Sequence, residues 1–494
     1  MLLLELYISM FILAAATFFT GRFSRPYALV VSGFYFLAFL VYSISQFYSL
    51  NGGFSAAETI LISPYYGFNF TLQVSGFSAL LVLLSLGVIF VAIFISDSRH
   101  GTVFFGLEML TMAGLVGLLL SSNVLFFYIF WEVVLIPVYF LIGIFGGRNA
   151  DSVSLKFFVY THIGSVLMLL SFFSLYSYQY NNTGTFAMSL SSLVTPSLFQ
   201  SMPEFWRLFV LFGFFVAFLV KLPSFPLHSW LPDSYEIAPY PVTIILAGAL
   251  SIMGGYGLFG ILLPVVSIMP YAFSVTLVVL GIVSLIYFSL AAMSQLSMKR
   301  MMAYASAAAM GFVTVSFGTS ALEIQGNIYA SNYMLDITGG MYQIMVHGLI
   351  MAFIFASLYY ISRSTGKEMI GSLGGIFREA PILSSFLLAA LLASLGLPGM
   401  AGFVAEFSIL AGIYPEVGFW ILLIIFGMLI TASYHIWMAQ RTLFGPYNEN
   451  LGSIPDSSTA SSAILVILLI IIVFLGVFPH YAFQLLSSYA SGVI

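Results

Sequence analysis

The stretch "FLVKLPSFPLHSW", residues 218–230, places a lysine at the end of an apolar run and follows it with two prolines and a histidine. A proline inside a helix removes a backbone hydrogen bond and kinks or breaks the helix. Backbone carbonyl groups freed in this way can be satisfied by water where they line a cavity. The stretch therefore predicts a broken helix with Lys221 at the break.

The composition around this stretch is that of an integral membrane protein. The chain has 494 residues, of which 61% are hydrophobic and 6% are charged, and its mean hydropathy is +1.10. A soluble domain has about 25% charged residues, whereas repeated apolar runs of about 20 residues are typical of transmembrane helices. The net charge of -4 and the lack of a long basic run exclude nucleic acid as a partner.

The chain contains no cysteine. This excludes disulfides, iron–sulfur clusters bound by cysteine and thiolate zinc sites, and we expect neither a metal nor a bound cofactor in this chain. The N-terminal segment lacks a basic region and contains Glu5. It is therefore interpreted as the first membrane helix and not as a cleaved signal peptide.

Polar gaps and gaps marked by glycine or proline divide the sequence into about fourteen predicted spans. They lie near 2–20, 27–49, 74–96, 103–120, 123–146, 157–178, 205–230, 240–262, 268–292, 300–318, 337–361, 380–412, 416–437 and 461–480. The sequence thus predicts an all-α integral membrane protein with about fourteen transmembrane helices.

The basic residues support this division, because eleven of the thirteen fall in odd-numbered loops. These are Arg22, Arg25, Arg99, Arg148, Lys156, Lys299, Arg300, Arg363, Lys367, Arg378 and Arg441. The exceptions are Arg207 and Lys221, which belong to the seventh span. By the positive-inside rule the odd loops face the cytoplasm or matrix, and both termini face the periplasm or intermembrane space.

A second break is expected at "LGLP" (395–398), five spans after "VKLP" (220–223). An odd number of spans between two breaks inverts the second half in the membrane, and inverted repeats with broken helices are typical of transporters. We predict one polytopic domain, 1–494, with two inverted five-helix repeats and broken seventh and twelfth helices. The repeats cover about 103–262 and about 268–437, with flanking helices in 1–96 and 461–480.

Few ionisable residues lie well inside the predicted spans, and a charge there costs about 2.5–3.5 kcal/mol on insertion scales and marks a functional site by default. They are Glu108, Glu132, His162, Lys221, His347, Glu406 and His435. His162 and His435 can instead be neutral interhelical hydrogen bonders, and Glu108 can be solvated near an interface. A purely structural or solvated role fits Glu132, Lys221 and Glu406 less well.

A buried lysine next to a mobile carboxylate can act as a proton switch. Burial disfavours the ammonium form, whereas a nearby carboxylate favours it. A Glu/Lys pair of variable separation therefore loads a proton when close and releases it when apart. On this interpretation Lys221 lies at the helix break because protons must reach it.

Five motifs resemble the antiporter-like subunits of respiratory complex I, and most of all the branch called chain 4 in mitochondria and subunit M in bacteria. They are "FFYIFWEVVLIPVYFLIGIFGG" (126–147), "KFFVYTHIGSVLML" (156–169), "VKLPSFPLHSWLPD" (220–233), "HGLIMAFIF" (347–355) and "LGLPGMAGFVAEF" (395–407). A fourteen-helix fold agrees with this family.

The resemblance implies roles for single residues. Glu132 and Lys221 match the ion pair of the fifth and seventh helices, and Glu406 matches the glutamate of the broken twelfth helix, the terminal station of the proton. His347 matches a relay histidine of the eleventh helix. Further possible relays are His228, Asp233, Tyr256, Ser306 and Lys299.

Three positions depart from the family pattern. Ile252 takes the place of the eighth-helix lysine, Ala309 that of a tenth-helix histidine, and Ser297 that of an aspartate. Either water bridges the gap together with hydroxyl groups, or the subunit conducts poorly; we favour the first. The hydroxyl groups considered are those of Ser251, Tyr256, Ser306 and Tyr342.

The resemblance implies a proton-translocating membrane-arm subunit of NADH:quinone oxidoreductase, part of the H+-translocating NADH:ubiquinone reductase. The redox reaction, with NADH, FMN, iron–sulfur clusters and quinone, is expected in other subunits. Expected partners are other membrane-arm subunits, flanking antiporter-like subunits and membrane lipids. Alternatives are a subunit of a sodium/proton antiporter or membrane hydrogenase, or a non-conducting scaffold.

A haem- or quinone-binding redox enzyme is disfavoured, because the six histidines show no repeated two-helix pattern. No presequence is visible, so we expect either an organelle-encoded or a prokaryotic chain. The absence of cysteine, the 51 phenylalanines and the departures from the family motifs favour the mitochondrial inner membrane. The prokaryotic plasma membrane is the alternative.

Overall fold

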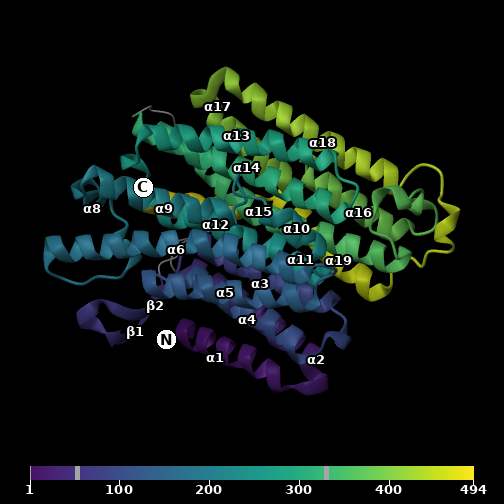
Figure 1. Ribbon diagram of the computed structural model, residues 1–494, viewed down its shortest axis with the longest axis horizontal. Helices are drawn as coiled ribbons and strands as arrows, with labels where there is room; N and C mark the ends of the chain where they lie inside the picture. Colours follow the sequence, from purple (N-terminus) through teal and green to yellow (C-terminus); the bar gives the residue numbers. More distant parts are fainter. Residues whose placement is uncertain (1, 50–55, 327–332) are drawn as a thin grey trace.

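The protein is an elongated bundle of long helices that lie side by side (Figure 1). The computed structural model describes residues 2–49, 56–326 and 333–494. Within them the structure is nearly all helical, as predicted, with one two-stranded antiparallel sheet.

Long helices alternate along the chain with short helices, and one pair of strands follows the second helix. In chain order the helices and strands are α1 (Leu2–Ala16), α2 (Ser24–Ser49), β1 (Ala56–Ser63), β2 (Phe68–Val74), α3 (Gly76–Ile95), α4 (Gly101–Leu120), α5 (Val124–Phe145), α6 (Ala150–Thr183), α7 (Leu190–Leu193), α8 (Pro196–Ser201), α9 (Glu204–Lys221), α10 (Trp230–Ile237), α11 (Tyr240–Ile245), α12 (Ser251–Tyr256), α13 (Tyr271–Met293), α14 (Met298–Gln325), α15 (Tyr333–Thr365), α16 (Pro381–Ser394), α17 (Ala401–Val417), α18 (Ile421–Thr442), α19 (Thr459–Val477) and α20 (His480–Val493).

Every predicted span has a helical counterpart. Among the described residues, 12 helical segments are long and apolar enough to cross a membrane, and one of these, 401–442, contains both α17 and α18. α16 has only 14 residues, and α9 carries three charged residues. The number fourteen, the repeats and the domain boundaries stay predictions.

Both predicted helix breaks are present. α9 ends at Lys221 and α10 begins at Trp230, whose indole N–H donates to the carbonyl of Val220 across the break at 3.0 Å. α16 ends at Ser394, and α17 begins at Ala401. In Figure 1 the two broken helices run in opposite directions, which is the geometry that an inverted repeat requires.

Two features were not predicted. Strands β1 and β2 form a hairpin in a region expected to be a loop, with Gly67 in the left-handed conformation (φ 69°) at the turn. Helix α20 follows the last predicted span. It buries Ala482, Leu486 and Ala490 at helical spacing, so it is an amphipathic helix. Its sequence has no continuous apolar run, which is the pattern from which the spans were predicted.

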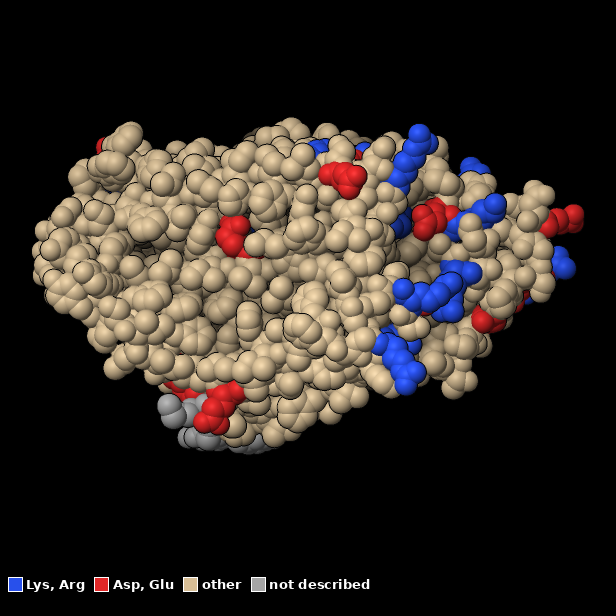
Figure 2. Space-filling view, turned by 60° about the horizontal axis from the view of Figure 1, so that its bottom comes forward, with Lys and Arg blue, Asp and Glu red and all other residues tan. Residues whose placement is uncertain are grey.

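The odd-numbered loops meet at one end of the bundle, where lysine and arginine side chains gather (Figure 2). Backbone hydrogen bonds join these loops: Gly147 donates to Ile237, Met298 to Glu368, and Gly375 to Phe444. The even-numbered loops meet elsewhere, because Ser122 donates to Thr71 and Val124 to Met188. We refer to the first group as the basic end; the compartment that it faces stays a prediction.

A carboxylate of the basic end caps the first half of the broken helix α16–α17. The two oxygens of Asp456 accept hydrogen bonds from the backbone N–H groups of Ile382 and Leu383, each at 3.0 Å. Loss of an N-terminal cap costs about 0.5–2 kcal/mol. We expect Asp456→Ala to lower the thermal stability of the purified protein, while Glu449→Gln, at an exposed carboxylate of the same loop, leaves it unchanged. Equal stabilities would show that the cap is dispensable.

Candidate proton-transfer site

Lys221 is the last residue of α9 and has only 1% of its surface exposed. Its Nζ lies 5.5 Å from the ring centre of Phe157 and 5.9 Å from that of Trp131. It has no hydrogen-bond partner among the described residues. The amine therefore lies between aromatic faces, which attract a cation, without a carboxylate in contact.

Glu132 has a different partner from the one expected. Its Oε2 lies 3.1 Å from His162 Nδ1, and its Oε1 accepts a hydrogen bond from the hydroxyl of Ser165, both on α6. Within the described residues, Glu132 and Lys221 form no ion pair in this conformation. This is the separated arrangement of the predicted pair of variable separation, and the switch itself stays a prediction. Consecutive side chains on a helix diverge by about 100°, so Trp131 faces Lys221 while Glu132 faces α6.

His162 is thus an interhelical hydrogen bonder, which was one of the two alternatives for it. Within the part of the chain that the structure describes, His435 bonds only in its own helix, its Nδ1 lying 2.8 Å from the carbonyl of Thr431. Glu108 is fully buried, with Ser96 Oγ 3.5 Å from its Oε1. The alternative in which Glu108 is merely solvated near an interface is therefore wrong.

The break after Lys221 is fastened to helices of the second predicted repeat. Ser224 Oγ lies 3.3 Å from Thr314 Oγ1 of α14, and the backbone N–H of Phe225 donates to Ser284 Oγ of α13 at 2.9 Å. These bonds satisfy polar groups that the break leaves inside the bundle. Hydrogen bonds therefore hold the break in place and connect the two predicted repeats.

Helix α12 separates the α9 break from α15. A Cβ added at Gly254 would come within 2.6 Å of the backbone N of Leu222, and one at Gly255 within 2.5 Å of Ile344. Ile252, where the family pattern has a lysine, is fully buried in this element. The π-helical turns 246–250 and 257–262 flank it. Such turns are frequent at functional sites, but here the side chain between them is apolar.

His347 lies on the other side of α12 and is paired with one predicted relay. Its Nε2 is 3.0 Å from Ser306 Oγ of α14, and both residues are buried. The other proposed bridging hydroxyls are engaged elsewhere: Ser251 donates to Ala247, Tyr256 to Leu119 and Tyr342 to Leu475. Among the described residues, Ser306 is the one of these four hydroxyls that lies beside a predicted ionisable site residue. The other three donate to backbone carbonyls instead.

Glu406 lies at the second break and is 7% exposed. A Cβ added at Gly396 would come within 2.6 Å of Glu406 Oε2, and Gly396 has a φ of +80°. Glycine is therefore required there both by its backbone conformation and by the carboxylate beside it. The break in α16–α17 leaves room for the carboxylate of Glu406 within the bundle.

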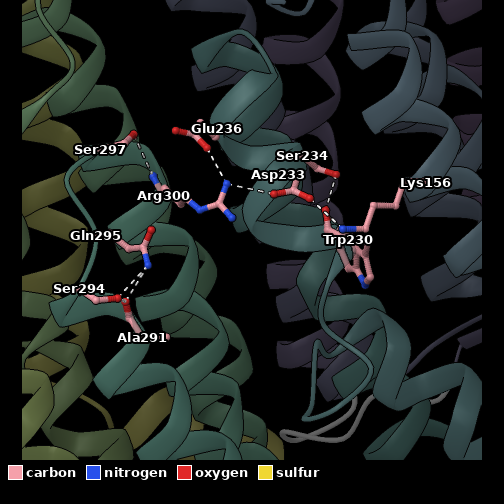
Figure 3. A network of polar contacts seen from close by, with 10 residues as sticks. All are labelled: Lys156, Trp230, Asp233, Ser234, Glu236, Ala291, Ser294, Gln295, Ser297 and Arg300. Carbon is pink, nitrogen blue, oxygen red and sulfur yellow. Dashed lines mark hydrogen bonds and ion pairs between the residues drawn. The ribbon is translucent and has the colours of Figure 1, made fainter. Parts of the chain in front are cut away.

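The remaining predicted relays lie toward the basic end. Asp233 bridges Lys156 at 2.8 Å and Arg300 at 3.0 Å, and Arg300 also bonds Glu236 at 2.8 Å (Figure 3). The network joins α6, α10 and α14. Its side chains are 27–38% exposed, and ion pairs at such sites contribute about 0–1 kcal/mol.

Lys299 and His228 stand apart from this network. Lys299 donates to the carbonyl of Ala238 at 2.5 Å and lies 4.6 Å from the ring centre of Tyr240. His228 packs against Phe288, with ring centres 4.6 Å apart. Ser297, in place of the family aspartate, caps α14 by accepting from the N–H of Arg300.

Two buried acids were missed by the sequence analysis. Asp336 is fully buried, and Glu323 is 1% exposed. The predicted spans 300–318 and 337–361 excluded both, because hydropathy falls at their ends, whereas α14 runs to Gln325 and α15 begins at Tyr333. The recurrence of polar residues at helical spacing could have shown that these helices continue.

The sequence and the fold of this chain resemble those of known membrane subunits. Residues 121–431 match the family described as NADH:quinone oxidoreductase/Mrp antiporter, transmembrane. The F(420)H(2) dehydrogenase subunit M of Methanosarcina mazei is 33% identical over 98% of this chain and 96% of its own length. The NADH-quinone oxidoreductase subunit M of Rickettsia felis is 31% identical over 85% of this chain and 82% of its own length.

This chain therefore belongs to the family of antiporter-like membrane subunits found in NADH:quinone oxidoreductases and Mrp antiporters. Its relatives include proteins named subunit M, the branch that the sequence motifs indicated. The fold also matches a chain of respiratory complex I from Thermus thermophilus, with a TM-score of 0.84, 24% identity, and coverage of 99% of this chain and 98% of that one.

Proposed function

We propose that this chain is a proton-translocating membrane subunit of an oxidoreductase complex related to complex I. The observation that carries the proposal is Lys221, a buried amine at a helix break with no hydrogen-bond partner among the described residues. A buried ionisable group facing a bundle interior is costly and marks an ion path by default. A purely structural role gives no reason for it.

The proposed path uses the residues in the order in which the helices place them. Lys221 receives a proton while Glu132 is near, and it releases the proton when Glu132 turns to His162, as in this conformation. Water across α12 carries the proton past Ile252 to His347 and Ser306, and then to Glu406. The driving force is electron transfer in other subunits.

The outer face of α5 and α6 is the proposed contact with a neighbouring membrane subunit. The side chains of Glu132 and His162 are 18% and 41% exposed on this face. A polar pair facing lipid is unfavourable, whereas a neighbouring subunit would cover it. Large apolar residues around it, including Ile136, Val159 and Ile163, are also exposed.

The redox partners are proposed to lie outside this chain. One relative is named for F(420)H(2) and another for NADH, so chains of this kind serve complexes with different electron donors. NADH, FMN, iron–sulfur clusters and quinone stay proposals for other subunits. The mitochondrial inner membrane also stays a prediction, beside a prokaryotic plasma membrane.

A sodium/proton antiporter is the second candidate, because the matched family includes Mrp antiporters. A direct test uses sealed inverted vesicles that contain the complex, with NADH or F(420)H(2) as donor. We expect donor oxidation to acidify the vesicle interior in sodium-free medium. Acidification that requires sodium, or sodium exchange driven by an imposed pH gradient without any donor, would favour the antiporter instead.

A further inference from the structure

Helix α15 carries a buried polar stripe on one face. Asp336, Gly340, Gln343 and His347 are spaced i, i+4, i+7 and i+11, which places them on the same side of a helix. Asp336 is fully buried, and Gln343 and His347 are each 3% exposed. The stripe extends about 16 Å at 1.5 Å per residue, from His347 to the end of α15 that lies away from the basic end.

The stripe faces hydroxyl groups of α14. Ser306 is 3.0 Å from His347, and at the other end Asp336 Oδ2 accepts from Thr319 at 2.6 Å and from Ser320 at 2.9 Å. Between them, a Cβ added at Gly340 would collide with Ser316 Oγ, so the two helices are in close contact. These residues form a polar seam between α14 and α15, which lie side by side in Figure 1.

The seam contains acceptors that no described residue satisfies. Among the described residues, Asp336 Oδ1, Gln343 Oε1 and both carboxylate oxygens of Glu323 have no hydrogen-bond partner. Glu323 lies one helical turn beyond Ser320 and is 1% exposed. Buried acceptors are normally paired with protein or water, so these atoms can take up a proton or bind water molecules.

The seam also lies beside the helix that carries Glu406. A Cβ added at Gly412 of α17 would come within 2.7 Å of Cβ of Asp336, and one at Gly339 within 3.0 Å of the backbone N of Ile409. Glu406 precedes Gly412 by six residues, about 9 Å along the helix. Asp336 is therefore placed between Glu406 and the end of the bundle opposite the basic end.

We propose that the α14–α15 seam is the outer half of the proton path and that Asp336 is its ionisable station. The carboxylate of Asp336 takes up a proton from the His347 and Glu406 side, and the carboxylic acid then releases it through Glu323 to the compartment opposite the basic end. Gln343, through its amide, holds the water between His347 and Asp336. This inference rests on the proposed function and names a step of it.

The test compares proton uptake by inverted vesicles that contain the wild-type complex, Asp336→Asn or Lys221→Met, with NADH or F(420)H(2) as donor. Asparagine retains the shape of Asp336 and its bonds to Thr319 and Ser320 but cannot carry a proton. We expect Asp336→Asn to assemble with unchanged thermal stability and to lower proton uptake about tenfold, since a positioned proton carrier contributes at least that much. Glu5→Gln, at an exposed carboxyl of α1, is the matched control.

Each outcome decides a separate point. Normal proton uptake in Asp336→Asn together with loss in Lys221→Met would overturn the seam and leave the proposed function standing. Normal uptake in both variants would overturn the proposed function itself. If Asp336→Asn does not assemble, Gln343→Leu takes its place: loss of uptake in that variant supports the seam, and wild-type uptake overturns it.

Discussion

Replacement of Lys221 by methionine is expected to lower proton uptake at least about tenfold, because a positioned proton-transfer group contributes about 10²–10⁴-fold. Methionine fills a similar volume between the rings of Phe157 and Trp131, so the packing around the break is retained. Methionine cannot bind a proton, so no proton can pass from the Glu132 side to His347 through this position. The measurement is the initial rate of acidification in sealed inverted vesicles under donor oxidation.

The control for this prediction is Lys367→Met. Lys367 is an exposed lysine of the basic end, and its loss changes the net charge of the protein by the same amount. We expect this control to pump at the wild-type rate. Equal losses in the two variants would mean that charge or assembly, and not the position of Lys221 at the helix break, determines the effect.

Glu406→Gln is the second substitution with a large expected effect. Glutamine keeps the side-chain length beside Gly396, but its amide cannot take up and release a proton as a carboxyl group does. Proton transfer through the second break should therefore stop. We expect uptake to fall at least about tenfold, with assembly unchanged, measured by the amount of complex purified and by its thermal stability.

Glu379→Gln, at a half-buried glutamate near the start of α16, provides the comparison for Glu406→Gln. Within the described residues it forms one ion pair, in which its Oε1 lies 3.4 Å from Nε of Arg378. We expect its proton uptake to equal that of the wild type. Wild-type uptake in Glu406→Gln would remove Glu406 from the path and would leave its burial at the break unexplained.

The sequence predicted those parts of the fold that depend on hydropathy and on proline. Apolar runs placed a helix in every predicted span, and "VKLP" and "LGLP" located both breaks. The hairpin β1–β2 and helix α20 were missed, because the first lies between spans and the second is amphipathic. Asp336 and Glu323 were missed for a related reason: polar residues end a hydropathy window, although the helices continue to Gln325 and from Tyr333.

The choice of hydrogen-bond partner could not be predicted from the sequence. Glu132 contacts His162 and Ser165 of α6 in this conformation, whereas the sequence motifs indicated Lys221. The hydroxyl of Tyr256 donates to the carbonyl of Leu119, a residue 137 positions away in the chain. Motif spacing identifies which residues are present in a site, whereas helix packing decides which of them meet.

The number of protons taken up per electron transferred tests most directly whether this chain conducts protons. The wild-type and Lys221→Met complexes would be compared in the same sealed vesicles, with donor oxidation and acidification recorded together. If the chain conducts protons through Lys221, the variant has a lower ratio, or both rates fall together and an ionophore does not restore oxidation. An unchanged ratio at an unchanged oxidation rate, in a fully assembled complex, would contradict this and would make the chain a scaffold.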